Sequence, residues 1–319
     1  MCRARARHGN AARRTNAGAG RERRGRRRGG RTVAATIRLI GTSIDQVPLT
    51  PLRGGAHIPQ LGFGVFQIPP RETEEAVARA LAAGYRHIDS AAAYRNEAAV
   101  GRAIRASGLD RGEVFVTTKC WNEDQGFDQA RRAFDGSLQR LETDYVDLYL
   151  IHWPVPAHER YLDTWRAFIE LRDEGLIRAI GVSNFQPAHL ERVISETGET
   201  PAINQIELHP YLQQPGLRHE HDRLGIVTEA WSPLAQGLVL DDPAIVAVAA
   251  AHGRTPGQIV IRWHVQLGNV VIPKSVTPGR IAENFDVFDF ALSDAEMQAI
   301  GALDAGRRTG PDPDTFIRP

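Results

Sequence analysis

Short apolar runs alternate with longer amphipathic stretches along almost the whole chain, from Ile58 onward. The apolar runs are five to eight residues long and rich in Val and Ile, a pattern typical of buried strands. Eight such runs are found, at residues 61–66, 86–90, 114–119, 146–153, 177–183, 202–207, 226–231 and 269–275. The pattern therefore predicts eight strands.

The stretches between and after these runs space their apolar residues three and four apart, as an amphipathic helix does. They are residues 73–84, 96–107, 128–141, 161–175, 186–198, 214–225, 242–253, 255–268, 277–285 and 292–303. In the first of them Thr73 is expected to cap the start of the helix, and Gly84 to end it. Strict alternation of strand and helix implies parallel strands joined by right-handed crossovers.

Eight strand–helix units in about 250 residues predict a (β/α)8 TIM barrel rather than an open sheet. The first strand is followed by no G-x-G-x-x-G leading into a helix, which disfavours a Rossmann site. Ahead of it, "VPLTPLRGGAHIPQ" predicts a β-hairpin turning at Gly54-Gly55, which would plug the barrel floor. No linker follows residue 60, so residues 45–319 are predicted to form one barrel domain with extra helices.

Charge divides the chain into two unlike parts. Residues 1–31 hold twelve of the 39 basic residues and one of the 38 acidic ones, so the other 288 residues have a net charge of −10. The segment lacks an apolar set, and we expect residues 1–35 to be a disordered Arg/Gly-rich extension. A nucleic-acid-binding tail is one interpretation, but without aromatic residues to stack on bases an inert extension is favoured.

No secretory signal or membrane span is predicted. "TVAATIRLIG" is interrupted by Arg38, and no run approaches the roughly 18 apolar residues of a spanning helix. A cytoplasmic protein is therefore expected. The two cysteines, Cys2 and Cys120, are not expected to pair, and no metal-binding cysteine pattern occurs. His219 and His221 are interpreted as solvated histidines at a polar helix end, so no metal is implied.

Four ionisable residues fall at three consecutive predicted strand ends: Asp89, Tyr94, Lys119 and His152. In a parallel barrel the carboxyl ends of the strands converge on one mouth. Each residue alone has an ordinary packing explanation, but together they suit one reaction. A nearby ammonium from Lys119 would lower the pKa of the Tyr94 phenol, while Asp89 holds that lysine charged. His152 would donate a hydrogen bond to a carbonyl oxygen that receives the phenol proton.

Four motifs carry a resemblance to a known family. They are "GYRHIDSAAAYRNEAAVG" (84–101), "LYLIHWP" (148–154), "IGVSNF" (180–185) and "IPKSVTPGRIAENF" (272–285). Across residues 45–310 the chain resembles the aldo-keto reductases, and most closely the bacterial 2,5-diketo-D-gluconate reductases and related small prokaryotic members. Their "TKLWN" appears here as "TKCWN", and Cys120 is expected to face away from Lys119 and to alter packing rather than chemistry.

The resemblance implies that Asp89, Tyr94, Lys119 and His152 are catalytic, with Tyr94 as the general acid, and that NADPH is the cofactor. Trp231 would stack on the nicotinamide, Asn184 and Gln205 would hold its carboxamide, and a basic segment before a helix start would bind its 2′-phosphate. The full cofactor set is Ser183, Asn184, Gln205, Trp231, Ser232, Leu234, Gln236, Gly237, Lys274, Ser275, Val276, Thr277, Arg280, Glu283 and Asn284. The substrate set is Phe66, Trp121, His152 and Trp153.

These residues predict NADPH-dependent reduction of small aldehydes, α-dicarbonyls or keto-sugars. The loop after His152 is short and only sixteen residues follow Leu303, which favours an open pocket and low selectivity. A monomer is expected. The alternatives are a non-catalytic NADPH-binding barrel subunit, a 2,5-diketo-gluconate reductase proper, a Schiff-base aldolase using Lys119, and a nucleic-acid-binding protein led by its arginine tail. The aldolase is disfavoured because Asp89 would keep Lys119 protonated.

Overall fold

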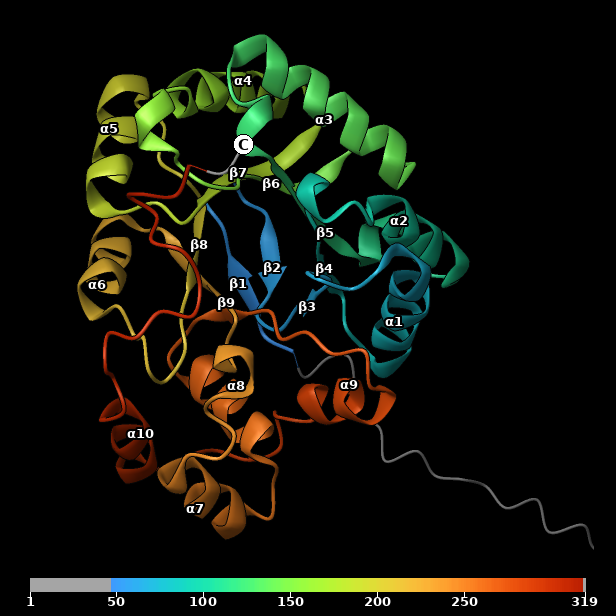
Figure 1. The fold of residues 1–319 in the computed structure, drawn as a ribbon. Coiled ribbons are helices and arrows are strands. Elements are labelled where there is room, and N and C mark those ends of the chain that lie inside the picture. The colour runs from blue at the N-terminus through green and yellow to red at the C-terminus, as the bar shows by residue number, and fades with distance from the viewer. Residues whose placement is uncertain (1–46, 318–319) are drawn as a thin grey trace, which may run out of the picture. The chain divides into compact units, whose positions relative to one another are not determined.

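Eight parallel strands form a ring that is surrounded by helices in the computed structural model, which describes residues 47–317 (Figure 1). The strands are joined in chain order, each hydrogen-bonded to the next. They are β3 (Phe63–Gly64), β4 (His87–Asp89), β5 (Phe115–Cys120), β6 (Val146–Ile151), β7 (Ile177–Ser183), β8 (Ile203–Glu207), β9 (Val227–Trp231) and β10 (Val270–Val271). All eight predicted strands are confirmed, most of them slightly shorter than their apolar runs.

The last strand returns to the first and closes the sheet into a barrel. Leu61 forms a parallel bridge with Val271. The Val271 amide donates to the Gln60 carbonyl at 2.9 Å, and the Gly62 amide donates to the Val271 carbonyl at 2.9 Å. Closure leaves no exposed edge among these strands, and the predicted (β/α)8 barrel is confirmed.

The helices lie outside the strand ring (Figure 1). They are α1 (Pro70–Ala83), α2 (Glu97–Ala106), α3 (Phe127–Leu141), α4 (Tyr161–Asp173), α5 (Pro187–Thr197), α6 (Pro215–Leu224), α7 (Pro243–His252), α8 (Pro256–Gln266), α9 (Pro278–Phe285) and α10 (Asp294–Gly301). Aromatic rings on the apolar faces of the helices pack against the strands. For example, Phe134 of α3 and Phe168 of α4 contact Tyr149 of β6, with ring centroids 4.9 and 4.4 Å away. None of the helices described is both long and apolar enough to cross a membrane.

The predicted start of the first helix is wrong by three residues. The helix begins at Pro70, because proline is pre-organised for the first helical position and needs no amide partner there. Thr73 is therefore a buried residue of the first turn, and its hydroxyl donates to the carbonyls of Ile68 and Pro69 at 3.1 and 3.0 Å. Gly84 ends the helix as predicted.

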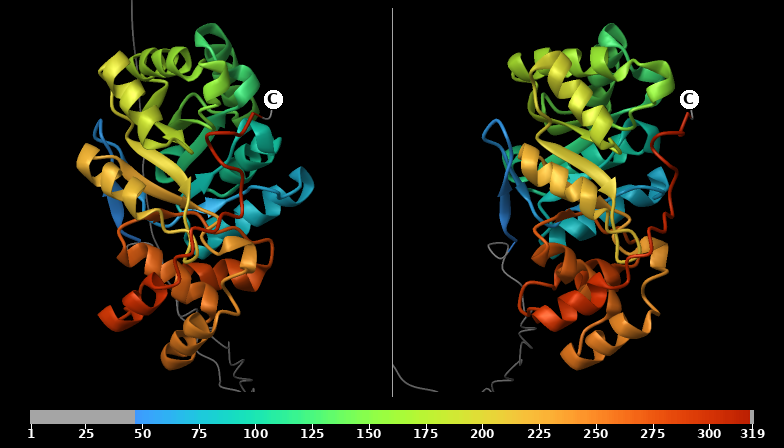
Figure 2. Two further views of the ribbon diagram at one scale, coloured as in Figure 1. Left: turned by 60° about the vertical axis from the view of Figure 1, so that its left-hand side comes forward. Right: turned by 90° about the vertical axis from the view of Figure 1, so that its left-hand side faces the viewer.

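The predicted hairpin is present and covers the amino-terminal end of the barrel. Strands β1 (Leu49–Pro51) and β2 (His57–Pro59) pair antiparallel, and Gly54 and Gly55 turn between them with φ of +92° each. Apolar hairpin residues pack with inward-facing residues of the strands; this group, the floor cluster, contains Leu52, Ile58, Phe115, Leu148, Leu150, Ala179, Ala202, Ile203 and Val270. The hairpin and the carboxyl-terminal segment lie at opposite ends of the barrel (Figure 2).

Two predictions fall partly or wholly beyond the described range. The Arg/Gly-rich extension, residues 1–35, and Cys2 within it lie outside the described residues. The domain boundary at residue 45 also precedes that range, and it stays a prediction.

Candidate active site

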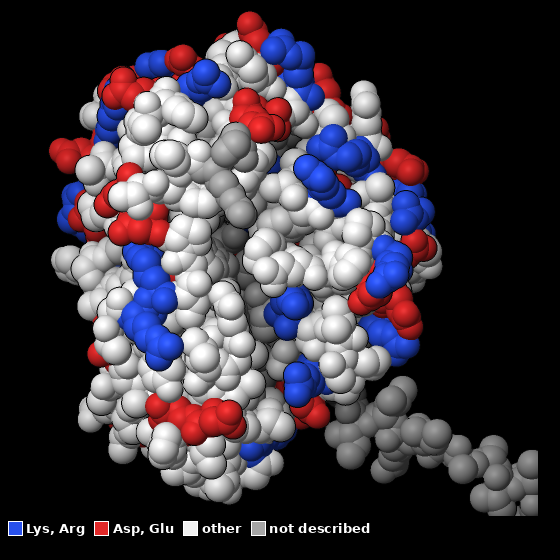
Figure 3. Space-filling view, viewed as in Figure 1, with Lys and Arg blue, Asp and Glu red and all other residues white. Residues whose placement is uncertain are grey.

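The four residues predicted to act together do meet at the carboxyl ends of the strands. Asp89 is the last residue of β4, Lys119 is the fifth residue of β5, His152 directly follows β6, and Tyr94 ends a short 3-10 turn, η2 (Ala92–Tyr94). At this end a groove with a volume of about 1840 Å³ is lined by Asp89, Tyr94 and His152, while Lys119 is fully buried behind them. Figure 3 looks onto this face, where the groove runs down the middle with basic side chains on both sides.

Lys119 and Asp89 form a buried ion pair. The Lys119 Nζ lies 2.7 and 2.9 Å from the two Asp89 carboxylate oxygens and donates to the Ser90 carbonyl at 2.8 Å. Burial acts to lower the pKa of Lys119, but the charge of Asp89 beside it acts in the opposite direction and leaves the pKa above its usual value. The lysine is therefore an ammonium, which cannot attack a carbonyl to form a Schiff base.

Tyr94 is held between aromatic rings above this ion pair. Its ring lies 5.0 Å from Phe66 and 5.6 Å from His152 between centroids, and the Lys119 Nζ is 5.1 Å from its centroid. Burial raises the pKa of the Tyr94 phenol to about 12, although the Lys119 ammonium acts to lower it. The expected net lowering is thus wrong, because loss of water around the phenolate outweighs one nearby cation. The phenol is protonated at neutral pH and available as an acid.

His152 faces Tyr94 across the groove as a neutral ring. Burial holds its pKa well below the usual histidine range, and the charge of Lys119 lowers it further. Its backbone amide donates to the Cys120 carbonyl at 3.1 Å, which fixes the residue at the end of β6. The indole of Trp121 contacts the imidazole with centroids 5.0 Å apart. A neutral imidazole has one N–H to donate, which suits a hydrogen bond to a carbonyl oxygen.

Cys120 belongs to the large apolar cluster between strands and helices, with Phe134 and Tyr149. Consecutive strand residues point to opposite faces, so Cys120 and Lys119 face away from each other. This arrangement agrees with the expected packing role of the cysteine.

Gln205, Asn184 and Trp231 line the groove beside the four residues, joined by hydrogen bonds. The Trp231 Nε1 donates to the Asn184 Oδ1 at 2.8 Å, and the Asn184 Nδ2 donates to the His152 carbonyl at 3.0 Å. Ser183 donates from its hydroxyl to the Gln205 carbonyl at 2.9 Å. The network connects β7, β8 and β9 and fixes four of the predicted cofactor residues relative to His152.

The loop after β9 adopts a demanding backbone conformation. Ser232 and Gln236 have φ of +48° and +56°, in the left-handed region that is costly for residues other than glycine. Five of the ten described non-glycine residues with positive φ line the groove: Gln67, Arg95, Asn184, Ser232 and Gln236. Backbone strain gathered at one groove is typical of a functional site. Leu234 and Gly237, also predicted, line the groove as well.

The predicted phosphate-binding residues lie at the far end of the same groove. Lys274, Ser275, Arg280, Glu283 and Asn284 line it, next to the start of α9, whereas Val276 and Thr277 are not among the lining residues. The Ser275 hydroxyl accepts from the Thr277 amide at 3.1 Å. No side chain caps the start of α9, so its first amides are available to an anion.

Aromatic residues form the outer walls of the groove, and one of them, Phe316, was not among the predicted substrate residues. Phe66, Trp121 and Trp153 line the groove as predicted, and so does Phe316, whose ring lies 4.3 Å from that of Trp153 between centroids. The carboxyl-terminal segment crosses the mouth, and Gly310 lies so close to Trp231 that a Cβ there would be 2.4 Å from its ring. The tail has no periodic pattern that could have revealed this contact. The carboxyl-terminal segment therefore reaches further over the pocket than its short length indicated.

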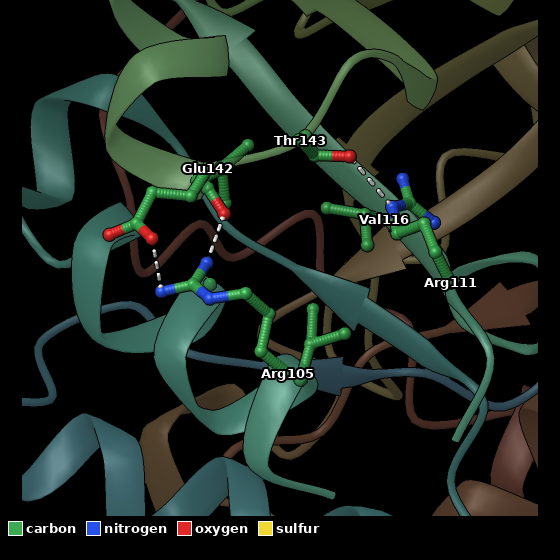
Figure 4. Close-up of a pocket in the computed structure, with 8 residues that line it drawn as sticks. Arg105, Arg111, Val116, Glu142 and Thr143 are labelled. Carbon is green, nitrogen blue, oxygen red and sulfur yellow. Dashed lines mark hydrogen bonds and ion pairs between the residues drawn. The ribbon is translucent and has the colours of Figure 1, made fainter. Parts of the chain in front are cut away.

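A second, small pocket lies between α2, α3 and β5 (Figure 4). Its volume is about 20 Å³, near the size of a single water. Its cationic side chains are already paired, since Arg105 contacts Glu142 at 2.8 Å and Arg111 donates to Thr143 at 3.0 Å. This pocket is too small and too well satisfied to hold a substrate.

The expected solvation of His221 is wrong. His221 is fully buried, with its Nδ1 2.8 Å from the Thr228 hydroxyl and its Nε2 2.9 Å from the Asn204 amide nitrogen. The helical period of α6 turns it inward, while the neighbouring His219 faces out. Within residues 47–317 no group of three potential metal ligands comes together.

Comparison with known proteins agrees with this geometry. Residues 54–305 match the model of the Aldo/keto reductase family. An aldo-keto reductase of Mycolicibacterium smegmatis is 61% identical over 269 residues, covering 84% of this chain and 98% of the relative. The methylglyoxal reductase DkgA of Escherichia coli is 54% identical over 267 residues, covering 83% of this chain and 96% of the relative. The chain therefore belongs to the aldo/keto reductase family.

A solved structure gives the same result for the fold. The crystal structure of a Gox0644 mutant in complex with NADPH matches with a TM-score of 0.82 and 47% sequence identity, covering 85% of this chain and 99% of that one. The resemblance read from the four motifs is confirmed at the level of the family.

Proposed function

We propose that this protein reduces small carbonyl compounds to alcohols with NADPH, with Tyr94 as the general acid. The observation that carries the proposal is the convergence of Tyr94, His152 and the buried Lys119–Asp89 pair on one groove. The same groove continues to a basic segment at the start of α9. A catalytic centre and an anion-binding end within one groove suit a large phosphorylated cofactor.

The residues present fit NADPH at both ends of the groove. Arg280 and Lys274, with the free amides at the start of α9, suit a phosphate group. Near the catalytic four, the ring of Trp231 offers a flat face and the Gln205 amide offers a polar group for a carboxamide. The NADPH complex of Gox0644 supports the choice of cofactor. We assign the remaining predicted cofactor residues on the groove, such as Ser232 and Gln236, to the same role.

The side chains divide the reaction between them. NADPH, when bound, supplies the hydride that the carbonyl carbon accepts. Tyr94 donates its proton to the carbonyl oxygen, and the neutral His152 donates a hydrogen bond to that oxygen and orients it. Lys119 stabilises the phenolate that remains, and Asp89 keeps this lysine charged. The phenolate then takes a proton from water in the open groove, which returns Tyr94 to its starting state.

The groove walls indicate the class of substrate. Phe66, Trp121, Trp153 and Phe316 surround the approach to Tyr94 with aromatic surface, which suits small flat carbonyl compounds and sugar faces. The E. coli relative is named a methylglyoxal reductase, which supports α-dicarbonyls. We propose small aldehydes, α-dicarbonyls and keto-sugars with low selectivity, and 2,5-diketo-gluconate as a narrower candidate. We also propose that the protein acts as a monomer, since one chain forms the whole groove. We propose the cytoplasm as its location.

The test is NADPH oxidation at 340 nm with methylglyoxal, 4-nitrobenzaldehyde and 2,5-diketo-gluconate, for wild type and Tyr94→Phe. We expect turnover to fall about 10³-fold in the variant, because the general acid is lost while the ring still packs. NADPH binding, followed by protein fluorescence, should be retained.

The matched control is Tyr145→Phe, because that ring is held between Arg111 and Arg178, 4.3 Å from each guanidinium carbon, and is absent from the groove lining. Its turnover should equal that of wild type. A wild-type protein that binds NADPH and reduces none of the panel would contradict the proposal and favour a non-catalytic NADPH-binding subunit. One substrate turned over far better than the others would contradict low selectivity.

A further inference from the structure

A second carboxyl group, which the sequence did not single out, lies beneath the catalytic four. Glu229 is the third residue of β9, and its side chain points into the barrel and is fully buried. Gln205 is its register partner on β8, so the two side chains emerge on the same face. Among the described residues, only Gln205 is within hydrogen-bonding distance of the Glu229 carboxyl group. A fully buried carboxyl with a single partner is costly, which points to a role beyond packing.

The contacts of Gln205 fix the orientation of its amide. One side-chain atom of Gln205 lies 2.8 Å from the Asp89 Oδ2 and 2.9 Å from the Glu229 Oε2. An atom placed between two carboxyl groups, one of them ionised in the pair with Lys119, must be the nitrogen. Both N–H groups of the amide are therefore used below the groove. The carbonyl oxygen is the only polar group that Gln205 has left to present to the groove that it lines.

We infer that Glu229 is a positioning residue that acts through Gln205, so that the groove offers a hydrogen-bond acceptor to the carboxamide N–H of the cofactor's nicotinamide. This inference rests on the proposed function and adds a residue to it. Without Glu229, Gln205 would keep one of its two anchors, and its amide could turn to present a donor instead. An acceptor at this position binds the N–H group of the carboxamide rather than its oxygen. It therefore fixes the orientation of the nicotinamide ring and determines which face of the ring meets the substrate.

The charge of Glu229 gives a second, independent readout. The ionisable groups facing it are His87 and Asp89 of β4, Lys119 of β5 and, beyond them, Tyr94; the His87 Nε2 is 3.7 Å from the Glu229 Oε1. Burial and the nearby Asp89 raise the pKa of Glu229 to about 8, while burial lowers that of His87 to about 3. Glu229 therefore keeps its proton to a higher pH than an ordinary glutamate, and it gains its negative charge only in more alkaline solution. That charge raises the pKa of Tyr94 and keeps the phenol protonated in alkaline solution.

The first experiment measures cofactor affinity for Glu229→Leu with two ligands, NADPH and 2′,5′-ADP, by isothermal titration at pH 7. Leucine removes the acceptor that anchors Gln205, so we expect the Kd for NADPH to rise about 10-fold. The Kd for 2′,5′-ADP should stay within about 2-fold of wild type, because that ligand has the phosphate end and no nicotinamide. Glu75→Leu, an exposed position on α1, is the control and should change neither value.

A double substitution tests whether the effect passes through Gln205. If it does, Glu229→Leu should add less than about 2-fold to the Kd for NADPH when Gln205 is already leucine, since coupled residues are not additive. A full additional 10-fold loss in the Gln205→Leu background would overturn the inference. So would an equal loss of affinity for NADPH and 2′,5′-ADP in Glu229→Leu.

The second experiment uses Glu229→Gln, which keeps the acceptor, imitates the neutral acid and provides a test if the leucine variant fails to fold. At pH 7 its NADPH affinity should stay within about 2-fold of that of wild type, because the acceptor for Gln205 is kept. In alkaline solution the variant lacks the added charge of Glu229, so Tyr94 should lose its proton at a lower pH. The alkaline limb of the reduction rate should move to lower pH by roughly one unit.

The results separate this inference from the proposed function. An unchanged NADPH affinity in Glu229→Leu would overturn the inference even though carbonyl reduction itself stands, and coincident pH–rate profiles for wild type and Glu229→Gln would remove the effect of the Glu229 charge on Tyr94. A wild-type protein that neither binds NADPH nor reduces carbonyls would overturn the proposed function first, and the inference with it.

Discussion

The two ends of the barrel are built from the same strands and bury opposite kinds of side chain. At the floor, Ile58 of the hairpin packs against apolar residues such as Leu148 and Ile203, and every member of the cluster is apolar. At the mouth, the strands bury an ion pair, Lys119 with Asp89, and a further carboxyl group at Glu229.

The two ends of the barrel separate stability from chemistry. Burying apolar area stabilises the fold by about 25 cal/mol per Å², whereas burying charges costs free energy unless they are paired and hydrogen-bonded. The floor therefore contributes stability. At the mouth, part of this stabilising free energy is offset by the cost of burying ionised groups. Because these groups are buried, their charges act more strongly on Tyr94 than they would in water.

The largest expected effect breaks the ion pair at the mouth. Lys119→Met leaves Asp89 buried without its partner, so we expect a loss of about 3–5 kcal/mol in the free energy of unfolding and a fall of about 10³-fold in turnover. Urea denaturation and NADPH oxidation measure the two quantities.

The double variant Lys119→Met/Asp89→Leu sharpens this result. Replacing both charges by apolar groups should restore most of the unfolding free energy, because no unpaired charge remains. Turnover should stay at the level of the single variant. Recovery of activity along with stability would show that the pair has a structural role only.

A substitution at the floor should have the opposite signature. Ile58→Ala removes buried methyl groups from the floor cluster, and we expect it to lower the free energy of unfolding by about 2–5 kcal/mol while kcat stays within about 2-fold. Leu49→Ala on the neighbouring strand is the control, since Leu49 is 60% exposed. A large change in kcat for Ile58→Ala would contradict the separation of the two ends.

The smallest effect is expected at the exposed phosphate end of the mouth. Arg280→Ala should raise the Kd for NADPH about 10-fold, because one charge-assisted phosphate contact is lost, and leave the Kd for NADH and the unfolding free energy unchanged. Arg132→Ala, an exposed arginine of α3, serves as the control. Equal losses for NADPH and NADH would remove the assignment of Arg280 to the 2′-phosphate.

The strands, the hairpin and the meeting of the four ionisable residues at the strand ends could be predicted from the sequence because each has a local signal. The Ile177–Ser183 strand was placed at its true bounds from its apolar run, and Asp89 and Lys119 stood out as charges at the ends of such runs. Local signals were weaker at helix starts, where Pro70 rather than Thr73 begins α1. They were misleading for His221, which lies in a polar stretch and is nevertheless buried.

The barrel, its family and the residue types at the strand ends follow from the sequence alone, because hydrophobic period and motif spacing are properties of neighbouring residues. The three-dimensional arrangement was needed to establish that burial outweighs Lys119 in setting the pKa of Tyr94, that Phe316 contacts Trp153, and that Glu229 anchors Gln205. These outcomes depend on distances and on exclusion of water between segments far apart in the chain, and no local pattern encodes them.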